Sequence, residues 1–436
     1  IRDVAVTGVQ TCALPILNRL FGEIVAGMKK CKELGKIPVS MAIDTWAVDY
    51  VLLDEKDQIL GDTYGYRDHR TDGMDAEVAK ILPETELYGK TGIQKQIFNT
   101  VYQLMAVKQQ TPELLQQAKT LLMLPDYFGF RLTGNKLSEY TNGSTTQLVD
   151  PHTYQWDKEL IRKLGYPEDI FLPLQMPGTK VGQLLPEIQK EVGFDLEVVL
   201  CGSHDTASAV MAVPQTEGDG IYISSGTWSL MGIESLKPVI TEDAAAANFT
   251  NEGGYDHRFR FLKNIMGLWM IQSVRHEYQD AYSFAQLCDM AEESRDFSSR
   301  VDVNDQSFLS PDSMIEAIKQ YCQKTSQPVP ETVGELAAVV YRSLAQSYGE
   351  TVKELETIAG RIYDSIHIIG GGSNAAYLNQ LTADATGKTV YAGPGEATAI
   401  GNLLAQMIHA GDLADLKGAR QCVRDSFEIK TYVPEN

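Results

Sequence analysis

The sequence predicts an α/β protein that is divided into two domains. At 436 residues, 43% of them hydrophobic, the chain is long enough to build more than one core. Short apolar runs bounded by turn residues alternate with longer segments at helical spacing. A predicted β-hairpin at 221–233 follows a helical segment at 206–213 and opens a new α/β unit. The domain boundary is therefore expected near residue 213, with domains at 17–213 and 214–436.

The net charge restricts the partners that the protein can have. Asp and Glu outnumber Lys and Arg by 58 to 38, which gives a formal charge of -20. Such a surface repels phosphate backbones and anionic membranes, so neither nucleic acid nor a membrane is an expected partner. A nucleotide is not excluded, because backbone N–H groups and a metal ion can bind phosphates locally.

The cysteines and the hydropathy pattern indicate a cytoplasmic protein. The six cysteines are scattered and form neither Cys-x-x-Cys pairs nor zinc-site spacings with histidine. Reduced thiols are favoured over a disulfide framework. No run approaches the ~20 apolar residues that span a bilayer, and no signal peptide is recognisable.

The first 16 residues differ from the rest of the chain. Residues 1–16 show no clear periodicity and are expected to be a non-native leader. From Leu17 onward, apolar residues at 17, 20, 21, 24, 25 and 28 follow helical spacing. A helix with one buried face is predicted to begin there.

The first domain is predicted to mix short strands with helices. Hydrophobic periodicity and turn residues place strands at 39–43, 48–53, 58–64 and 198–200, and helices at 98–122 and 126–132. The second helix is expected to stop at Thr133 and Gly134. The proline-rich stretch 167–186 is predicted to be a long surface connection.

The second domain is predicted to be richer in helices. Helices are expected around 262–278, 284–293 and 333–359. A strand at 366–369 then runs into four small residues, Gly370 to Ser373, and a helix that begins near Ala375.

Three features of the sequence could carry chemistry, and each also has a purely structural interpretation. The strand, glycine turn and helix at 366–381 suit a phosphate but equally suit a tight turn, and they match neither the dinucleotide nor the Walker pattern. The hairpin turn 224–227 offers hydroxyls and a glycine to phosphate oxygens, or is an ordinary polar turn. Asp205 could accept a proton from an attacking hydroxyl, or could only begin the helix that follows it.

The order of these features, together with several specific runs, resembles the FGGY family of carbohydrate kinases, and within it the rhamnulokinase subfamily. The resemblance covers about residues 17 to 430. The runs that carry it are Ile43-Asp44-Thr45-Trp46-Ala47-Val48-Asp49, Tyr66-Arg67-Asp68, Phe98-Asn99-Thr100, Leu124-Pro125-Asp126-Tyr127, Glu139-Tyr140-Thr141-Asn142, Ser203-His204-Asp205-Thr206-Ala207-Ser208-Ala209, Gly226-Thr227-Trp228-Ser229 and Asn264-Ile265-Met266-Gly267-Leu268-Trp269.

The resemblance implies a fold and an activity. The fold would be two actin-like, ribonuclease H-like domains that flank a central cleft. The activity would be transfer of the γ-phosphoryl group of ATP, with Mg²⁺, to the 1-hydroxyl of L-rhamnulose. Three alternatives stay open: a kinase for another ketose or polyol, an inactive truncated kinase, and a non-catalytic nucleotide-binding protein of the actin type. The oligomeric state is not predicted.

The resemblance also implies roles for individual residues. Asp205 matches the proton acceptor. The matched sugar contacts are Trp46, Ala47, Asp49, His204, Thr206 and Asn264, and the matched ATP contacts are Thr227, Gln272, Gly371 and Gly372. Asn264 and Gln272 are expected to lie on one helical stretch, and without the resemblance both would be interpreted as polar surface. Ala47 stands where the family is expected to have glycine. No metal ligands are predicted.

The start of the chain departs from the family. The family begins with a strand and a phosphate-binding hairpin, Asp-Leu-Gly-Ala-Ser-Ser-Gly-Arg, and no such run occurs here. The first domain is therefore expected to be incomplete at its N-terminus. Part of the phosphate site and a metal-coordinating carboxylate would then be missing.

Overall fold

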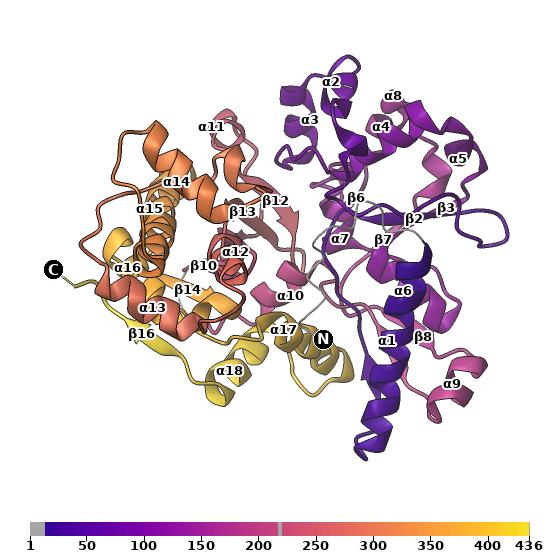
Figure 1. The fold of residues 1–436 in the computed structure, drawn as a ribbon. Helices are drawn as coiled ribbons and strands as arrows, with labels where there is room; N and C mark the ends of the chain where they lie inside the picture. Colours follow the sequence, from indigo (N-terminus) through magenta and orange to yellow (C-terminus); the bar gives the residue numbers. More distant parts are fainter. Residues whose placement is uncertain (1–13, 217–219, 436) are drawn as a thin grey trace. The chain divides into compact units, whose positions relative to one another are not determined.

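The computed structural model describes residues 14–216 and 220–435. Most of the predicted leader, residues 1–13, lies outside the described residues, and helix α1 (Leu14–Glu33) begins three residues before the predicted start. The chain forms two compact units (Figure 1). The first unit contains the residues up to Ser208 together with Ser235–Arg260 and Gly401–Ala414. The second contains Ala209–Glu234, Phe261–Ile400 and the residues from Asp415 onward.

The first unit contains short strands and many helices. Its strands are β1 (Ser40–Met41), β2 (Tyr50–Leu53), β3 (Thr120–Met123), β4 (Ser138–Glu139), β5 (Val149–Asp150), β6 (Gln155–Trp156), β7 (Leu174–Gln175), β8 (Lys180–Gln183), β9 (Glu197–Val199) and β12 (Thr250–Gly253). Besides α1, its helices are α2 (Met74–Ala79), α3 (Glu84–Thr91), α4 (Thr100–Gln110), α5 (Pro112–Gln117), α6 (Leu124–Thr133), α7 (Tyr140–Ser144), α8 (Lys158–Leu164), α9 (Pro186–Val192) and α11 (Glu242–Ala246). Short 3₁₀ turns lie at His69–Thr71 and Glu168–Ile170.

Three of the predicted strands of the first unit are present, namely β1, β2 and β9, and the first two are shorter than predicted. β1 pairs in parallel with β9, and β9 pairs with β8, while β2 and β3 are antiparallel. The predicted strand at 58–64 is wrong, because only an isolated bridge joins Leu53 to Ile59, and Gly61, at φ +66°, then turns the chain. The end of the predicted helix at 98–122 is also wrong. Residues 120–123 form the fully buried strand β3, and a short buried apolar run does not by periodicity alone distinguish strand from helix.

Helix α1 covers one core of the first unit, as its spacing predicts. Leu17, Phe21, Val25 and Met28 are all buried along one face. They belong to a cluster that also contains residues of α6, α9 and β9. Helix α6 ends at Thr133 and is closed by Gly134 at φ +76°, where the sequence predicts the stop.

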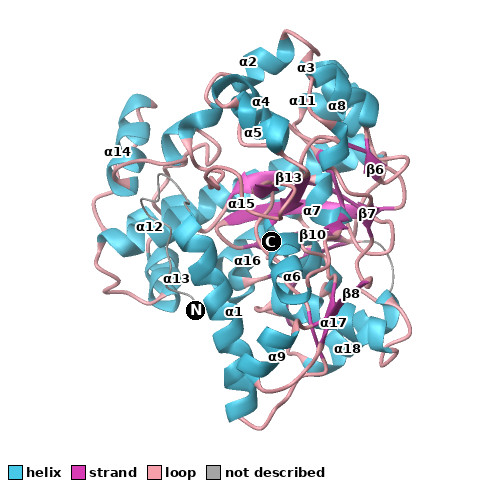
Figure 2. Ribbon diagram, turned by 90° about the vertical axis from the view of Figure 1, so that its right-hand side faces the viewer, coloured by secondary structure: helices cyan, strands magenta, loops and turns pink. Residues whose placement is uncertain are grey.

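The second unit is built on a mixed sheet. Its strands follow the order β13 (Phe259–Met266), β11 (Trp228–Ser235), β10 (Ile221–Ser225), β14 (Ser365–Ile369), β15 (Thr389–Ala392) and β16 (Lys430–Tyr432). β10, β14 and β15 are parallel, and β10 and β11 form the predicted hairpin. The helices are α12 (Trp269–Glu277), α13 (Phe284–Glu293), α14 (Met314–Lys324), α15 (Val333–Ala359), α16 (Ala376–Thr386) and α18 (Leu416–Ser426), with 3₁₀ turns at Gln306–Phe308 and Gly371–Asn374. Figure 2 shows the helices of both units in cyan and the strands in magenta.

The helix predictions in the second unit are confirmed with one exception. Helices α13 and α15 have the predicted bounds, and both begin with a capping box. The prediction of helix from residue 262 is wrong, because 259–266 form strand β13 and helix α12 begins only at Trp269. Residues 259–262 are all fully buried, so both faces of the strand are covered and no alternation of buried and exposed residues marks it as a strand.

Two helices cross the boundary between the units along the chain, α10 (Asp205–Met211) and α17 (Ala397–Ala410). None of the helices in residues 14–216 and 220–435 combines the length and hydrophobicity that crossing a bilayer requires.

Candidate active site

Asp205 lies at the first position of α10, beside the segment that carries Trp46. Thr45 and His204 form a parallel bridge in which Thr45 N–H donates to Ser203 O at 2.9 Å and Asp205 N–H donates to Thr45 O at 2.9 Å. These backbone bonds fix the position of Trp46 relative to the start of the helix. The structure thus brings together two parts of the sequence that are about 160 residues apart.

The carboxylate of Asp205 is accessible. Its Oδ1 accepts hydrogen bonds from the backbone N–H of Thr206 at 2.7 Å and from Thr206 Oγ1 at 3.2 Å. The side chain is 47% exposed, so a ligand hydroxyl can reach it. A carboxylate that a hydroxyl can reach is able to accept the proton of that hydroxyl.

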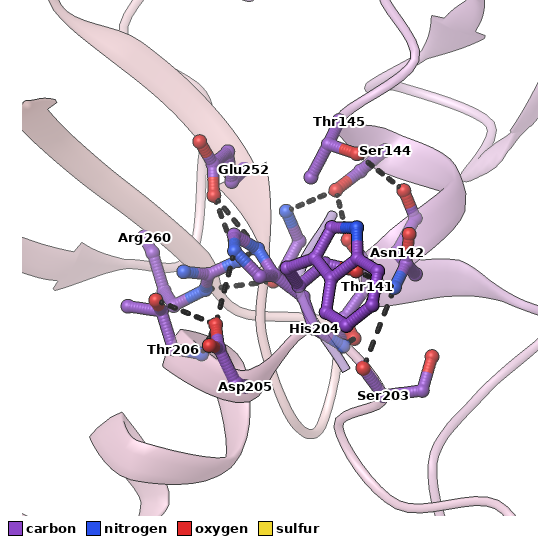
Figure 3. Close-up of polar contacts among 12 residues, drawn as sticks. Thr141, Asn142, Ser144, Thr145, Ser203, His204, Asp205, Thr206, Glu252 and Arg260 are labelled. Atoms are coloured by element: carbon purple, nitrogen blue, oxygen red, sulfur yellow. Dashed lines mark hydrogen bonds and ion pairs between the residues drawn. The ribbon is translucent and has the colours of Figure 1, made fainter. Parts of the chain in front are cut away.

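His204 joins Asp205 to a buried ion pair (Figure 3). Its Nε2 lies 3.4 Å from Asp205 Oδ1, and its Nδ1 lies 3.1 Å from Glu252 Oε2. Arg260 Nη2 donates to Glu252 Oε2 at 3.0 Å and lies 3.0 Å from His204 Nδ1. All four residues belong to the first unit.

Glu252 is an ionised carboxylate inside the protein. Burial alone would raise the pKa of Glu252, but the charge of Arg260 and the hydrogen bond with His204 lower it. Neither Glu252 nor Arg260 is among the residues predicted from the sequence. The available signal is a single arginine in an apolar strand, between Phe259 and Phe261, since a fully buried arginine requires a partner.

The carboxylate of Glu139 is hydrogen-bonded to the segment that contains Ser203 and His204. Its Oε2 accepts from Ser203 Oγ at 2.5 Å, Ser203 N–H at 3.2 Å and Thr141 Oγ1 at 2.6 Å. Asn142 Nδ2 lies 3.4 Å from both Trp46 O and Ser203 O, so it links the two segments. Burial raises the pKa of Glu139. The sequence contains this run as part of the family resemblance but gives it no role.

The exposed indole of Trp46 is hydrogen-bonded to the buried carboxylate of Asp49. Trp46 is 37% exposed, and its Nε1 donates to Asp49 Oδ2 at 2.6 Å. Asp49 is buried and also accepts from Tyr66 N–H at 3.2 Å and from Gln103 Nε2 at 3.3 Å. Ala47, between them, is half-buried, and its carbonyl accepts from Asp49 N–H at 2.9 Å. The indole ring is therefore available to a ligand rather than enclosed in a core.

The raised pKa of Asp49 predicts that the stability of the protein depends on pH. Burial raises the pKa of Asp49 to about 7, despite the opposing hydrogen bonds from Trp46 and Gln103. The folded state therefore holds a proton that the unfolded state releases near its ordinary pKa of 3.8. This contribution to the free energy of unfolding is complete below the unfolded pKa and is lost as the pH rises through about 7.

An Asp49→Asn variant should flatten that dependence. The free energy of unfolding, measured by urea titration between about pH 5 and pH 7, should fall less steeply with pH in the variant than in the wild type. The two slopes should differ by at most about 1.4 kcal/mol per pH unit. Asp44 acts with the same sign, because burial raises its pKa to about 6, but it is present in both proteins. Asp62→Asn, at an exposed position, is the control. Parallel slopes for the wild type and Asp49→Asn would contradict the prediction.

Asp44 is a further, half-buried carboxylate whose pKa is affected by the charge of Asp205. Its Oδ2 accepts from Asn402 Nδ2 at 2.6 Å, and the charge of Asp205 contributes to its raised pKa after burial. The residue lies in a run that carries the family resemblance, where the sequence assigns no role to it. The described residues contain no group of three or more His, Cys, Asp or Glu side chains that could hold a metal ion.

In the second unit, the hairpin turn contacts the start of α12. Thr227 is exposed at the turn between β10 and β11, and its carbonyl accepts from Trp269 N–H at 3.2 Å. The neighbouring Gly226 carbonyl accepts from Leu268 N–H at 2.9 Å. A Cβ on Gly267 would lie 2.5 Å from the Trp228 carbonyl carbon, so only glycine permits this approach.

The glycine turn after β14 packs on the same hairpin. Gly370 has φ +83°, and a Cβ there would lie 2.9 Å from Ser225 O. A Cβ on Gly372 would overlap the Ser225 side chain. Gly371 is exposed and begins the 3₁₀ turn, so its backbone is accessible where the strand ends. This geometry suits a phosphate group, although glycine is also needed for packing alone.

The two remaining predicted residues lie on different elements, which corrects the prediction of one helical stretch. Asn264 is on strand β13, and Gln272 is in α12, where its N–H donates to Leu268 O at 2.8 Å. The Asn264 Oδ1 is buried without a hydrogen-bond partner in the part of the chain that the structure describes. The predicted site residues thus fall into two groups: Trp46, Ala47, Asp49, His204, Asp205 and Thr206 in the first unit, and Thr227, Asn264, Gln272, Gly371 and Gly372 in the second.

Comparison with known proteins covers nearly the whole chain. Residues 16–212 match the N-terminal domain, and residues 221–410 the C-terminal domain, of the FGGY family of carbohydrate kinases. A rhamnulokinase of Halalkalibacterium halodurans is 53% identical over 96% of this chain and 89% of its own length. A rhamnulokinase of Bacillus subtilis is 47% identical over 96% of this chain and 86% of its own length.

Solved structures show the fold. A xylulose kinase from Lactobacillus acidophilus superposes with a TM-score of 0.77 at 16% identity, covering 98% of this chain and 86% of that one. A Plasmodium falciparum glycerol kinase with ADP gives a TM-score of 0.75 at 15% identity, covering 98% and 87%. The predicted fold class, a two-domain actin-like α/β fold, is confirmed.

Proposed function

Because the chain belongs to the FGGY family of carbohydrate kinases, we propose that it transfers the γ-phosphoryl group of ATP to the 1-hydroxyl of L-rhamnulose. The rhamnulokinases that are 47% and 53% identical over almost its full length support this substrate. The observation that carries the proposal is the accessible Asp205 carboxylate, bonded through its backbone to the segment of Trp46.

Asp205 would act as the general base. Its carboxylate accepts the proton of the 1-hydroxyl as the hydroxyl oxygen attacks the γ-phosphorus, and ADP leaves. Orientation of the reactants and neutralisation of charge supply most of the rate in this class of reaction, with the base as a smaller term. His204 and Thr206, on either side of the base, are proposed sugar contacts.

The indole of Trp46 would form an apolar wall for the sugar, and Asp49 orients that ring through its Nε1. Ala47 lies in the same segment, where its methyl group limits how closely a sugar can approach the backbone. Asn264 is proposed as a further sugar contact, since its buried Oδ1 has no hydrogen-bond partner within the described residues.

ATP would bind to the second unit. We propose that the nucleotide is contacted by Thr227, Gln272, Gly371 and Gly372. Thr227 is exposed at the turn of the β10–β11 hairpin, and the glycine turn that contains the exposed Gly371 packs on the same hairpin at Ser225. Mg²⁺ would be bound mainly through the phosphates of ATP and water, which fits the lack of a three-ligand cluster among the described residues. When bound, the ion would supply neutralisation of charge on the transferring phosphoryl group.

A cytoplasmic location fits this reaction. The five described cysteines, Cys31, Cys201, Cys288, Cys322 and Cys422, are free thiols, as is usual in a reducing compartment. The charge of -20 favours small-molecule ligands over nucleic acid or an anionic membrane.

A coupled assay of ADP release tests the substrate. With ATP and Mg²⁺, L-rhamnulose should give the highest kcat/KM in a panel that also contains xylulose, fuculose and glycerol. Mass spectrometry should identify a sugar 1-phosphate as the product. A higher kcat/KM for another member would assign a different sugar specificity, and ADP release that no sugar stimulates would contradict the kinase proposal for this chain.

A further inference from the structure

The buried ion pair of Glu252 and Arg260, next to His204, has no part in the proposed reaction. Arg260 is fully buried, and the side chain of Glu252 is 7% exposed. Removing such groups from water costs several kcal/mol, which their attraction offsets only when the geometry is good. A pair of well-packed apolar side chains would stabilise the unit equally well. The stability of the fold therefore does not by itself account for these charges.

The pair contacts one nitrogen of the His204 ring and leaves the other facing Asp205. Glu252 Oε2 and Arg260 Nη2 lie 3.1 Å and 3.0 Å from Nδ1, while Nε2 lies 3.4 Å from Asp205 Oδ1 (Figure 3). In a histidine, the group bound at one ring nitrogen sets the orientation of the ring and the role of the other nitrogen. The side chains thus form a continuous array from the interior to the accessible carboxylate.

Glu252 itself is held rigidly by its own strand. The next residue, Gly253, donates its N–H to Ser144 Oγ at 2.8 Å, and its carbonyl accepts from Arg260 Nε at 2.9 Å. The preceding residue, Asn251, donates its N–H and its Nδ2 to Gly92 O at 2.9 Å and 3.0 Å. A carboxylate anchored on both sides can fix a neighbouring ring within a fraction of an ångström, as catalytic groups require.

We propose that Glu252 is a positioning residue for phosphoryl transfer: paired with Arg260, it holds the His204 ring so that Nε2 faces Asp205 and the acceptor hydroxyl. This inference rests on the proposed role of Asp205 as the base. Glu252 touches neither reactant in this scheme and acts through His204 alone. Its loss should therefore lower kcat much more than it alters the KM for ATP.

The first test combines kinetics with a double-mutant cycle. Glu252→Gln should lower kcat for the sugar by about 10²-fold, the usual cost of a displacement near 1 Å, and should leave the KM for ATP unchanged. In a His204→Ala background the same substitution should have no further effect, because both changes remove one function. Additive losses in the two backgrounds would overturn the proposal.

Controls separate positioning from simple destabilisation. Glu197→Gln breaks another glutamate–histidine pair of the first unit, with His409 at 2.7 Å, and should leave kcat unchanged. Glu252→Gln leaves Arg260 without its carboxylate partner and could unfold the unit. The double variant Glu252→Gln with Arg260→Gln removes both charges together, and it should fold and still show the reduced kcat. A double variant with wild-type kcat would contradict the proposal.

A second readout does not depend on turnover. In protein carrying ¹⁵N-labelled histidine, the His204 ring signals, assigned through His204→Asn, should shift in Glu252→Gln and stay in place in Glu197→Gln. Unchanged His204 signals in Glu252→Gln would overturn the inference even if the enzyme is active. If the wild type phosphorylates no sugar, the proposed function fails, and the ring signals still decide whether Glu252 orients His204.

Discussion

An Asp205→Asn variant should bind ATP and L-rhamnulose but lose about 10²- to 10⁴-fold in kcat, the range that a general base contributes. The amide is close in size to the carboxylate, and its oxygen can still accept the bonds from Thr206 N–H and Oγ1. It cannot take a proton from the attacking hydroxyl. Single-turnover kinetics with excess enzyme would measure the chemical step directly, and calorimetric titration would measure both affinities.

The matched control for this variant is the neighbouring hydroxyl. Thr206→Ser keeps the hydroxyl beside Asp205 and should retain the wild-type rate within a few-fold, since it removes one methyl group. A near-normal rate in Asp205→Asn would exclude the base assignment. Equal losses in affinity and rate would instead indicate that Asp205 mainly binds the sugar.

A Gly401→Ala variant should be destabilised by about 1–3 kcal/mol or more. Gly401 is buried in α17, and an added Cβ would overlap the carbonyl of Ser208 in α10, which is backbone and cannot rotate away. Alanine at a helical position usually gains up to about 1 kcal/mol over glycine, so the steric overlap must outweigh that gain. Thermal unfolding and urea midpoints give the comparison.

Gly27→Ala is the matched control for that substitution. Gly27 also lies in a helix, α1, but it is exposed, and a Cβ there would meet nothing within 4 Å. This variant should gain about 0.5–1 kcal/mol. If Gly401→Ala were as stable as Gly27→Ala, the close packing of α10 on α17 would be refuted.

The elements best predicted from the sequence are those with strong local signals. Helices α13 and α15 have capping boxes and long periodic faces, which fix their ends from local residues alone. The predictions of helix at the residues of β3 and in the first half of 262–278 were wrong because these segments lack such local signals. Their apolar residues are buried by neighbours distant in sequence, and such short runs carry no period that separates strand from helix.

The residues of the candidate site likewise include some that the sequence singles out and some that only the structure shows. Asp205 is singled out because the run around it carries the family resemblance, and its role as the base stays a prediction. Glu252 could not be singled out in the sequence, since its proposed role depends on contacts with His204 and Arg260 that form only in the folded protein. A sequence reveals a charged group in an apolar strand, but the partner that satisfies it is a property of tertiary structure.

The parallel bridge between Thr45 and His204 separates two tasks of the first unit. Asp205 N–H donates to the main-chain carbonyl of Thr45, whereas the exposed side chain of Trp46 is the part of that residue proposed to contact the sugar. Exchanging the indole for another side chain would therefore leave the frame of the base unchanged. On the proposed assignment, substitutions at residue 46 would change the shape of the sugar site and leave the proposed base in place, which makes this position a practical starting point for redesigning specificity.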